Sequence, residues 1–162
     1  MSRQFALKSA CVATFVLCAV TVFGQMPNPY GTPVTGENAK KAAAAALAEA
    51  RKNNWTMAAA VVDPSGDLVY FEKVDGTQAA SVDIAIDKAR SAARFKRPTK
   101  ALQDVLAAGG VGLRLLALQG AVPVDGGVPL LMDGKIVGAI GLSGGSSDQD
   151  GQCANAGAAT LK

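Results

Sequence analysis

Residues 128–142 read VPLLMDGKIVGAIGL, and this stretch predicts a β-hairpin. Two apolar runs, Val128 to Met132 and Lys135 to Leu142, have the length and the β-branched content of strands. The residues between them, Asp133-Gly134, favour a two-residue type I′ turn, which requires a positive φ at both positions. The C-terminal third of the chain therefore contributes a pair of adjacent antiparallel strands.

A second hairpin is predicted earlier in the chain. Trp55 to Val62 is apolar enough for a buried strand, and Leu68 to Lys73 follows as its partner. Between them, Asp63-Pro64-Ser65-Gly66 favours a type I turn that closes on a glycine in the left-handed region. A fifth strand is expected at Leu113 to Leu118, among several glycines.

Helical patterns separate and flank these strands. One stripe of apolar residues from Ala79 to about Phe95 repeats at helical spacing, and Pro98 ends it. The other expected helices are 36–52 with Thr35 as N-cap, 99–107 with Thr99 as N-cap, and 147 to about 161 with Ser147 and Asp150 as a capping box. The sequence thus predicts an α+β fold, a five-stranded antiparallel sheet flanked by helices.

The first 24 residues have the three zones of a secretory signal. Arg3 and Lys8 form a basic start, an apolar run from Ala10 to Phe23 follows, and Gly24 precedes the expected cleavage site. The run is too short for a membrane span, so no stable membrane insertion is expected after cleavage. The expected organisation is a signal peptide (1–24), an extended arm (25–34) and one domain (35–162), exported to the periplasm or secreted.

Composition excludes several classes of function. The chain has no histidine, which removes His-based catalytic triads and imidazole ligands for metal or haem. Without the signal peptide the net charge is near +1, and aromatic residues are few, so no nucleic-acid partner is expected. Cys153 is the only cysteine after the signal peptide, so no internal disulfide forms, and it is interpreted as a small core residue.

The order of several short motifs resembles the GlcG/HbpS-like family, the haem-degrading domain family. The resemblance extends from about Thr35 to Leu161. It rests on Asp63-Pro64-Ser65-Gly66, Lys88-Ala89-Arg90, Gly126-Gly127-Val128-Pro129, Gly138-Ala139-Ile140-Gly141-Leu142-Ser143-Gly144-Gly145, Gln149-Asp150 and Ala156-Gly157.

This resemblance implies a profilin-like antiparallel sheet and assembly into dimers or larger rings. Family members include an extracellular haem-binding protein that degrades haem, a haem-binding domain attached to a cobalamin adenosyltransferase, and a protein of glycolate-utilisation operons. The resemblance implies haem as cofactor or ligand and a homo-oligomer. Members that ligate haem iron through histidine differ from this chain, which has none.

A basic run at the end of the 79–95 helix is the first candidate site. Arg90, Arg94 and Arg97 fall at i, i+4 and i+7, a spacing that places them on one helical face able to hold haem propionates or another carboxylate. The alternative is a solvated stripe in which Asp87 pairs with Arg90 and Asp83 with Lys88 or its neighbours.

Further candidates lie beside this run and at strand ends. Thr99 is a candidate iron ligand because of its position beside the basic run, and its alternative role is the N-cap of the next helix. The other candidate donors are Tyr30, Tyr70, the methionines, Cys153 and the lysines. The pairs Gly126-Gly127 and Gly144-Gly145 are expected to bring backbone N–H groups to a flat or anionic ligand, or else to serve only as turns and a cap.

Three functions remain open at this point. The first is an exported haem- or tetrapyrrole-binding protein, with any haem degradation being peroxide-driven chemistry of the iron. The second is an enzyme or binding protein for small carboxylates such as 2-hydroxy or 2-keto acids. The third is an oligomeric accessory protein without a ligand. No pair of residues has the spacing of a nucleophile and its base, so the catalytic residues are unknown.

Overall fold

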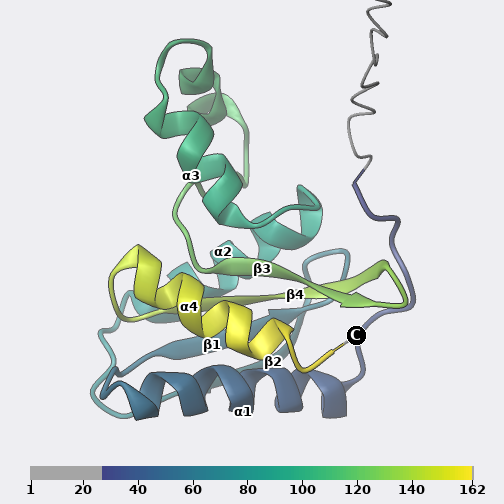
Figure 1. Cartoon of the computed structure of the whole chain (residues 1–162), viewed down its shortest axis with the longest axis vertical. Helices are drawn as coiled ribbons and strands as arrows, with labels where there is room; N and C mark the ends of the chain where they lie inside the picture. The colour runs from purple at the N-terminus through teal and green to yellow at the C-terminus, as the bar shows by residue number, and fades with distance from the viewer. Residues whose placement is uncertain (1–26, 162) are drawn as a thin grey trace, which may run out of the picture.

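A single antiparallel sheet of four strands forms the centre of the protein in a computed structural model, which describes residues 27–161 (Figure 1). The predicted signal peptide and the first two residues of the arm lie outside the described residues. The strand order is β2-β1-β4-β3. The strands are β1 (Ala58–Val62), β2 (Leu68–Lys73), β3 (Gly127–Met132) and β4 (Lys135–Ser143).

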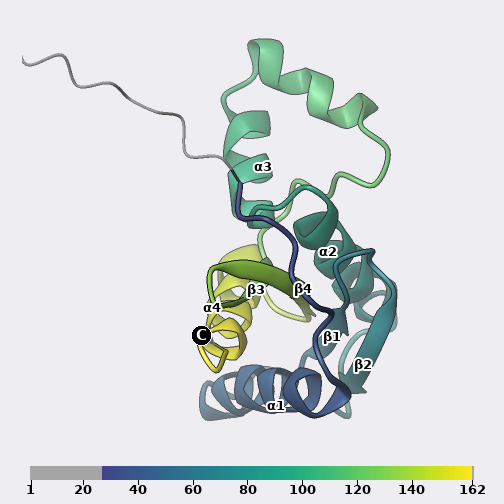
Figure 2. The same ribbon diagram turned by 90° about the vertical axis from the view of Figure 1, so that its right-hand side faces the viewer.

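Helices cover both faces of this sheet, as Figure 2 shows. Helices α1 (Gly36–Lys52) and α4 (Ser147–Ala158) pack on one face, and α2 (Ser81–Arg94) packs on the other. The side chains of β1 alternate between two separate apolar clusters: Ala59 and Val61 belong to the α1/α4 side, while Ala58, Ala60 and Val62 belong to the α2 side. No helix among residues 27–161 is long and apolar enough to cross a membrane.

Small residues allow the α2 layer to lie close to the sheet. A Cβ added to Gly141 of β4 would lie 2.1 Å from the carbonyl oxygen of Ala85 and 2.6 Å from the amide of Ala89. Alanines at positions 85, 89, 92 and 93 of α2 are fully buried. Helix α2, which carries the predicted basic run, is therefore a rigid element held on the sheet by backbone-to-backbone contact.

Both predicted hairpins are confirmed, with one shorter strand. Asp133 and Gly134 have φ angles of 49° and 70°, as a type I′ turn requires. In the other hairpin, Gly66 has a φ of 93° and its N–H donates to the carbonyl of Asp63 at 3.0 Å. Strand β1 begins at Ala58, three residues after the predicted start.

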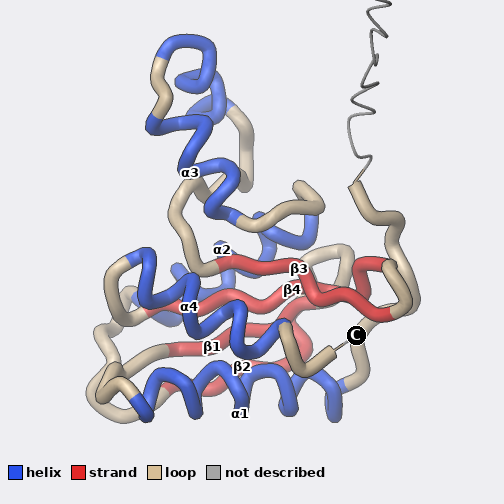
Figure 3. The backbone as a smooth tube through the Cα atoms, viewed as in Figure 1, coloured by secondary structure: helices blue, strands red, loops and turns tan. Residues whose placement is uncertain are grey.

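The predicted fifth strand is wrong. Residues 113–118 lie mainly in a 3-10 helix, η1 (Gly110–Ala117), which follows α3 (Thr99–Ala107) in a lobe that extends away from the sheet (Figures 1 and 3). Gly109 and Gly110 have positive φ angles and turn the chain here, and no residue of η1 is buried. The apolar run has no neighbouring strand to pair with, so its β-propensity does not determine its structure.

The caps of the helices match the predictions only in part. Thr35 caps α1 as expected, accepting from the Asn38 N–H. The predicted cap of α3 is wrong, because Pro98 occupies that position and Thr99 is already helical. The capping box of α4 consists of Ser146 and Gln149, one residue earlier than predicted.

The described part of the arm packs on the domain. Its backbone runs beside β4, where the Gly31 N–H donates to Ile136 O at 2.8 Å and the Val34 N–H donates to Val137 O at 2.7 Å. The Tyr30 hydroxyl donates to the carbonyl of Ala93 at 2.9 Å, which ties the arm to the end of α2.

Candidate functional site

Two arginines near the end of α2 are held in fixed orientations by the turn between β1 and β2. The Arg90 Nε–H donates to the Gly66 carbonyl at 3.1 Å, and the Arg94 Nε–H donates to the Ser65 carbonyl at 2.8 Å. A Cβ on Gly66 would lie 2.7 Å from Arg94 Nε, so this guanidinium lies against the glycine backbone. Each guanidinium thus uses Nε for the protein. Arg94 keeps its outer N–H groups for other acceptors, whereas one outer nitrogen of Arg90 lies 3.7 Å from Asp87.

These arginines line a hollow of about 620 Å³ on the α2 side of the sheet. The other lining residues are Asp87, Gln119, Gly120 and Val122. The Val122 N–H donates to Ser91 Oγ at 3.0 Å, and this bond holds the segment after η1 against α2. The volume lies in the range of small-molecule sites, and the lining is mostly polar.

The hollow carries a net positive charge. Asp87 Oδ1 lies 3.7 Å from Arg90 Nη1, an exposed i,i+3 pair that matches the predicted solvated pairing. Arg94 forms no ion pair with any residue in 27–161. One cation is therefore balanced and the other is left for a ligand.

Arg97 does not line this hollow. Helix α2 ends at Arg94, and Lys96 has a positive φ of 54°, so helical spacing no longer applies at position 97. The Arg97 Nε–H donates to the Phe95 carbonyl at 3.0 Å. Of the three predicted arginines, the structure brings together the first two.

Thr99 and the two glycine pairs are occupied with bonds inside the chain. Thr99 is fully buried, and its Oγ1 accepts from the Gly127 N–H at 2.9 Å. The Gly126 N–H donates to Asp125 Oδ1, and the Gly145 N–H donates to Asp150 Oδ1 at 3.0 Å. These bonds favour a role in turns for the glycine pairs, and they give Thr99 a structural role other than the predicted N-cap, namely holding the Gly127 backbone. Ligand binding by Thr99, Gly126, Gly127, Gly144 and Gly145 stays a prediction.

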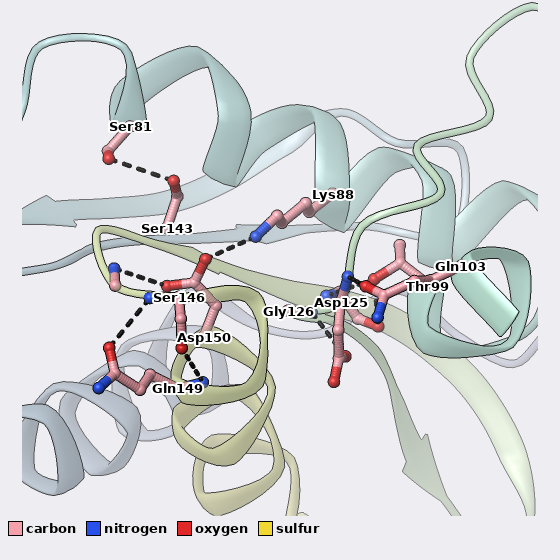
Figure 4. A network of polar contacts seen from close by, with 12 residues as sticks. Ser81, Lys88, Thr99, Gln103, Asp125, Gly126, Ser143, Ser146, Gln149 and Asp150 are labelled. Atoms are coloured by element: carbon pink, nitrogen blue, oxygen red, sulfur yellow. Dashed lines mark hydrogen bonds and ion pairs between the residues drawn. The ribbon is translucent and has the colours of Figure 1, made fainter. Parts of the chain in front are cut away.

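A buried ion pair that the sequence reasoning missed lies between α2 and α4 (Figure 4). Lys88 Nζ is 2.7 Å from Asp150 Oδ2, and their side chains are 1% and 4% exposed. Burial raises the pKa of Asp150, although the Lys88 ammonium and the Gly145 N–H act against that shift. Lys88 does not pair with Asp83 as the solvated-stripe alternative supposed. The missed signal is that Lys88 follows buried Ser81 and Ala85 at helical spacing, on the inner face of α2.

Asp125 is the second acid of this region and lies beside α4. A Cβ on Gly151 would lie 2.2 Å from Asp125 Oδ2. Burial raises the pKa of Asp125, and the hydrogen bond from the Gly126 N–H opposes the shift. This cluster anchors the start of β3 and the start of α4 to α2, the helix that carries the two arginines.

Two smaller hollows lie near the arm and share no lining residue with the arginine hollow. One, of about 320 Å³, lies between the arm and the β3–β4 hairpin and includes Asn38, Met132 and Lys135. The other, of about 230 Å³, includes Lys96, Pro98 and Leu131. Neither of these two hollows is lined by two groups of the same charge whose orientation is fixed by hydrogen bonds to backbone carbonyls, as Arg90 and Arg94 are.

Metal-ligating side chains are not gathered anywhere in residues 27–161, where no group of three acidic, cysteine or histidine residues lies together. Cys153 is buried, as predicted, and burial raises the pKa of its thiol to about 11. The thiol is therefore protonated at neutral pH and is a poor metal ligand.

Comparison with known proteins identifies the family. The model of a protein family described as "Haem degrading protein HbpS-like" matches residues 34–159. The chain belongs to the HbpS-like family. Protein GlcG of Escherichia coli K12 is 37% identical over 100 residues, which span 62% of this chain and 73% of GlcG. A 15.0 kDa protein encoded between dhaT and dhaS in Citrobacter freundii is 34% identical over 119 residues, 72% of this chain and 84% of that protein.

Solved structures of HbpS-like proteins have the same fold. An HbpS double mutant from Streptomyces reticuli has a TM-score of 0.74 and 34% identity, covering 96% of this chain and 99% of that one. A PduOC structure, described as a haem complex, has a TM-score of 0.72 and 26% identity, covering 81% of this chain and 96% of that one. These relatives confirm the resemblance and the α+β class.

Proposed function

We propose that this protein binds haem or a closely related tetrapyrrole at the hollow beside α2, with Arg90 and Arg94 holding its carboxylates. The observation that carries the proposal is the pair of guanidinium groups that the Ser65–Gly66 carbonyls orient toward one hollow. Bidentate guanidinium bonds suit carboxylates in both geometry and charge. The haem complex of the related PduOC domain supports a tetrapyrrole as the ligand.

The residues fit the carboxylates of haem and not its iron. The hollow is lined by Asp87, Arg90, Arg94, Gln119, Gly120 and Val122, which include no imidazole, thiolate, thioether or phenolate. We therefore propose haem binding alone, without a haem-degrading step.

A small carboxylate is the second candidate ligand, and the polar lining of the hollow favours it. Gln119 and Arg94 would suit a 2-hydroxy or 2-keto acid, which needs no apolar surface. A rise in melting temperature with such an acid, in the absence of any response to haem, would select this candidate.

Export and self-association complete the proposal. Residues 1–24 support secretion to the periplasm or medium, and the mass of the recovered protein should correspond to a chain that begins at Gln25. The exposed apolar residues of the α3–η1 lobe, Val105, Val111, Leu113, Leu116, Leu118 and Val124, support a homo-oligomer, to be measured by light scattering.

The binding test is an absorbance titration of the protein with haem. A saturable change is expected, and Arg94→Gln should weaken binding by about tenfold or more, since it removes a charge-assisted hydrogen bond worth about 1.5–3 kcal/mol. Arg97→Gln is the matched control, because Arg97 lies outside the hollow, and it should leave the affinity unchanged. Equal losses in both variants, or a titration that never saturates, would contradict the proposal.

A further inference from the structure

The sulfur atoms of the described residues lie on the wrong face of the sheet to reach a ligand in the arginine hollow. Met57 and Cys153 are fully buried in the apolar cluster between the sheet and helices α1 and α4, and Met132 packs against that cluster. The arginine hollow is on the α2 face. The sheet therefore separates Arg94 from each described thiol and thioether.

The tyrosine hydroxyls are engaged elsewhere. Tyr70 packs on the α1/α4 side, and its hydroxyl donates to Glu72 at 2.9 Å. Tyr30 is nearer to α2, and its hydroxyl lies 2.9 Å from the Ala93 carbonyl and 3.3 Å from the Arg94 carbonyl, but it does not line the hollow. Burial raises the pKa of Tyr30, which disfavours the phenolate that would ligate iron.

The positive groups of the hollow are, in contrast, preorganised. Arg90 and Arg94 are one helical turn apart on a helix that packs closely on the sheet, and each is held through Nε by a separate carbonyl. Preorganised donors bind without the entropy cost of ordering flexible side chains. The energy of recognition at this hollow is thus concentrated on the acidic groups of a ligand.

We propose that the hollow selects tetrapyrroles by their carboxylates, independently of the metal, so that metal-free protoporphyrin IX binds as tightly as haem. This inference rests on the proposed function and specifies the ligand class of the same site: planar dicarboxylic tetrapyrroles, with or without a metal. The whole chain contains no histidine that could favour the iron form.

The test compares three probes on the purified protein, using quenching of its single tryptophan as a common signal. The probes are haem, metal-free protoporphyrin IX and the dimethyl ester of protoporphyrin IX. The dissociation constants of the first two are expected to agree within about threefold, and the ester should bind about tenfold or more weakly, because it carries no carboxylate. Arg94→Gln should raise the dissociation constants of haem and protoporphyrin IX by the same factor.

Two results would overturn the inference while leaving tetrapyrrole binding intact. One is haem binding more than about thirtyfold tighter than protoporphyrin IX, with that advantage lost in Tyr30→Phe or Met132→Leu, which would reveal an iron ligand. The other is an ester that binds as tightly as the free acid. If neither haem nor protoporphyrin IX saturates, the proposed function itself fails, a result distinct from both.

Discussion

Replacing Asp150 by asparagine should strongly destabilise the protein, because it leaves the Lys88 ammonium buried without a counter-ion. The two groups are 2.7 Å apart and are 1% and 4% exposed, so water cannot replace the lost carboxylate. Asparagine has nearly the same shape and retains an oxygen that accepts from the Gly145 N–H, as Asp150 Oδ1 does. The substitution therefore removes the charge and little else.

Removing one partner of a buried ion pair costs about 3–5 kcal/mol. For a domain of this size, each kcal/mol lowers the melting temperature by roughly 3–4 °C, so Asp150→Asn should melt about 10–20 °C below the parent protein. Scanning calorimetry or thermal circular dichroism at pH 7 measures this difference directly.

The matched control is Asp104→Asn at the exposed i,i+4 pair with Lys100. Those side chains are 60% and 45% exposed, and an exposed pair contributes less than about 1 kcal/mol. The control should melt within about 3 °C of the parent protein. If Asp150→Asn shifts the melting temperature no more than Asp104→Asn does, the Lys88–Asp150 pair does not hold α2 to α4.

Three further predictions concern close packing and buried polar groups. In urea denaturation, Gly127→Ala should destabilise the protein more than Gly134→Ala, because a Cβ at position 127 would lie 2.3 Å from the Lys88 carbonyl oxygen. A Cβ at position 134 meets nothing within 4 Å and costs only about 1–2 kcal/mol of backbone strain, so equal losses of unfolding free energy would contradict the close packing at Gly127. Thr99→Val should cost about 1–3 kcal/mol by leaving the buried Gly127 N–H unpaired, and Thr99→Ser should restore most of it. Burial raises the thiol pKa of Cys153 from 9.0 to about 11, so the folded state holds this proton more tightly and the unfolding free energy should fall by roughly 2 kcal/mol as pH rises from 9 to 11. In Cys153→Ala this contribution to the pH dependence of the unfolding free energy should be missing.

Local turn and helix chemistry made much of the fold predictable. Asp133-Gly134 and the turn ending at Gly66 each admit few backbone conformations, so both hairpins follow from short-range sequence. The run 113–118 has strand propensity, yet whether it pairs depends on a free sheet edge nearby, which is a tertiary property that the sequence does not display. The sheet accordingly has four strands and not five.

The candidate site was predictable only up to the end of a helix. Helical spacing correctly placed Arg90 and Arg94 together, and it failed at Arg97 because the helix ends before that residue. The Lys88–Asp150 pair joins residues 62 positions apart, and no local pattern reveals such a contact. The sequence therefore predicts only a helix-capping role for Asp150, because its partner Lys88 lies on a different helix.

A ¹H–¹⁵N spectrum of the arginine Nε–H groups, recorded during titration with metal-free protoporphyrin IX, tests most directly whether the hollow beside α2 is the ligand site. The Nε–H groups of Arg90 and Arg94 donate to backbone carbonyls, which protects their signals from exchange with water. Saturable shifts of these two signals at one concentration midpoint are expected, with no shift at Arg97. A saturable shift confined to Arg97, or binding that leaves all arginine signals unchanged, would contradict the assignment of the ligand site to the hollow beside α2.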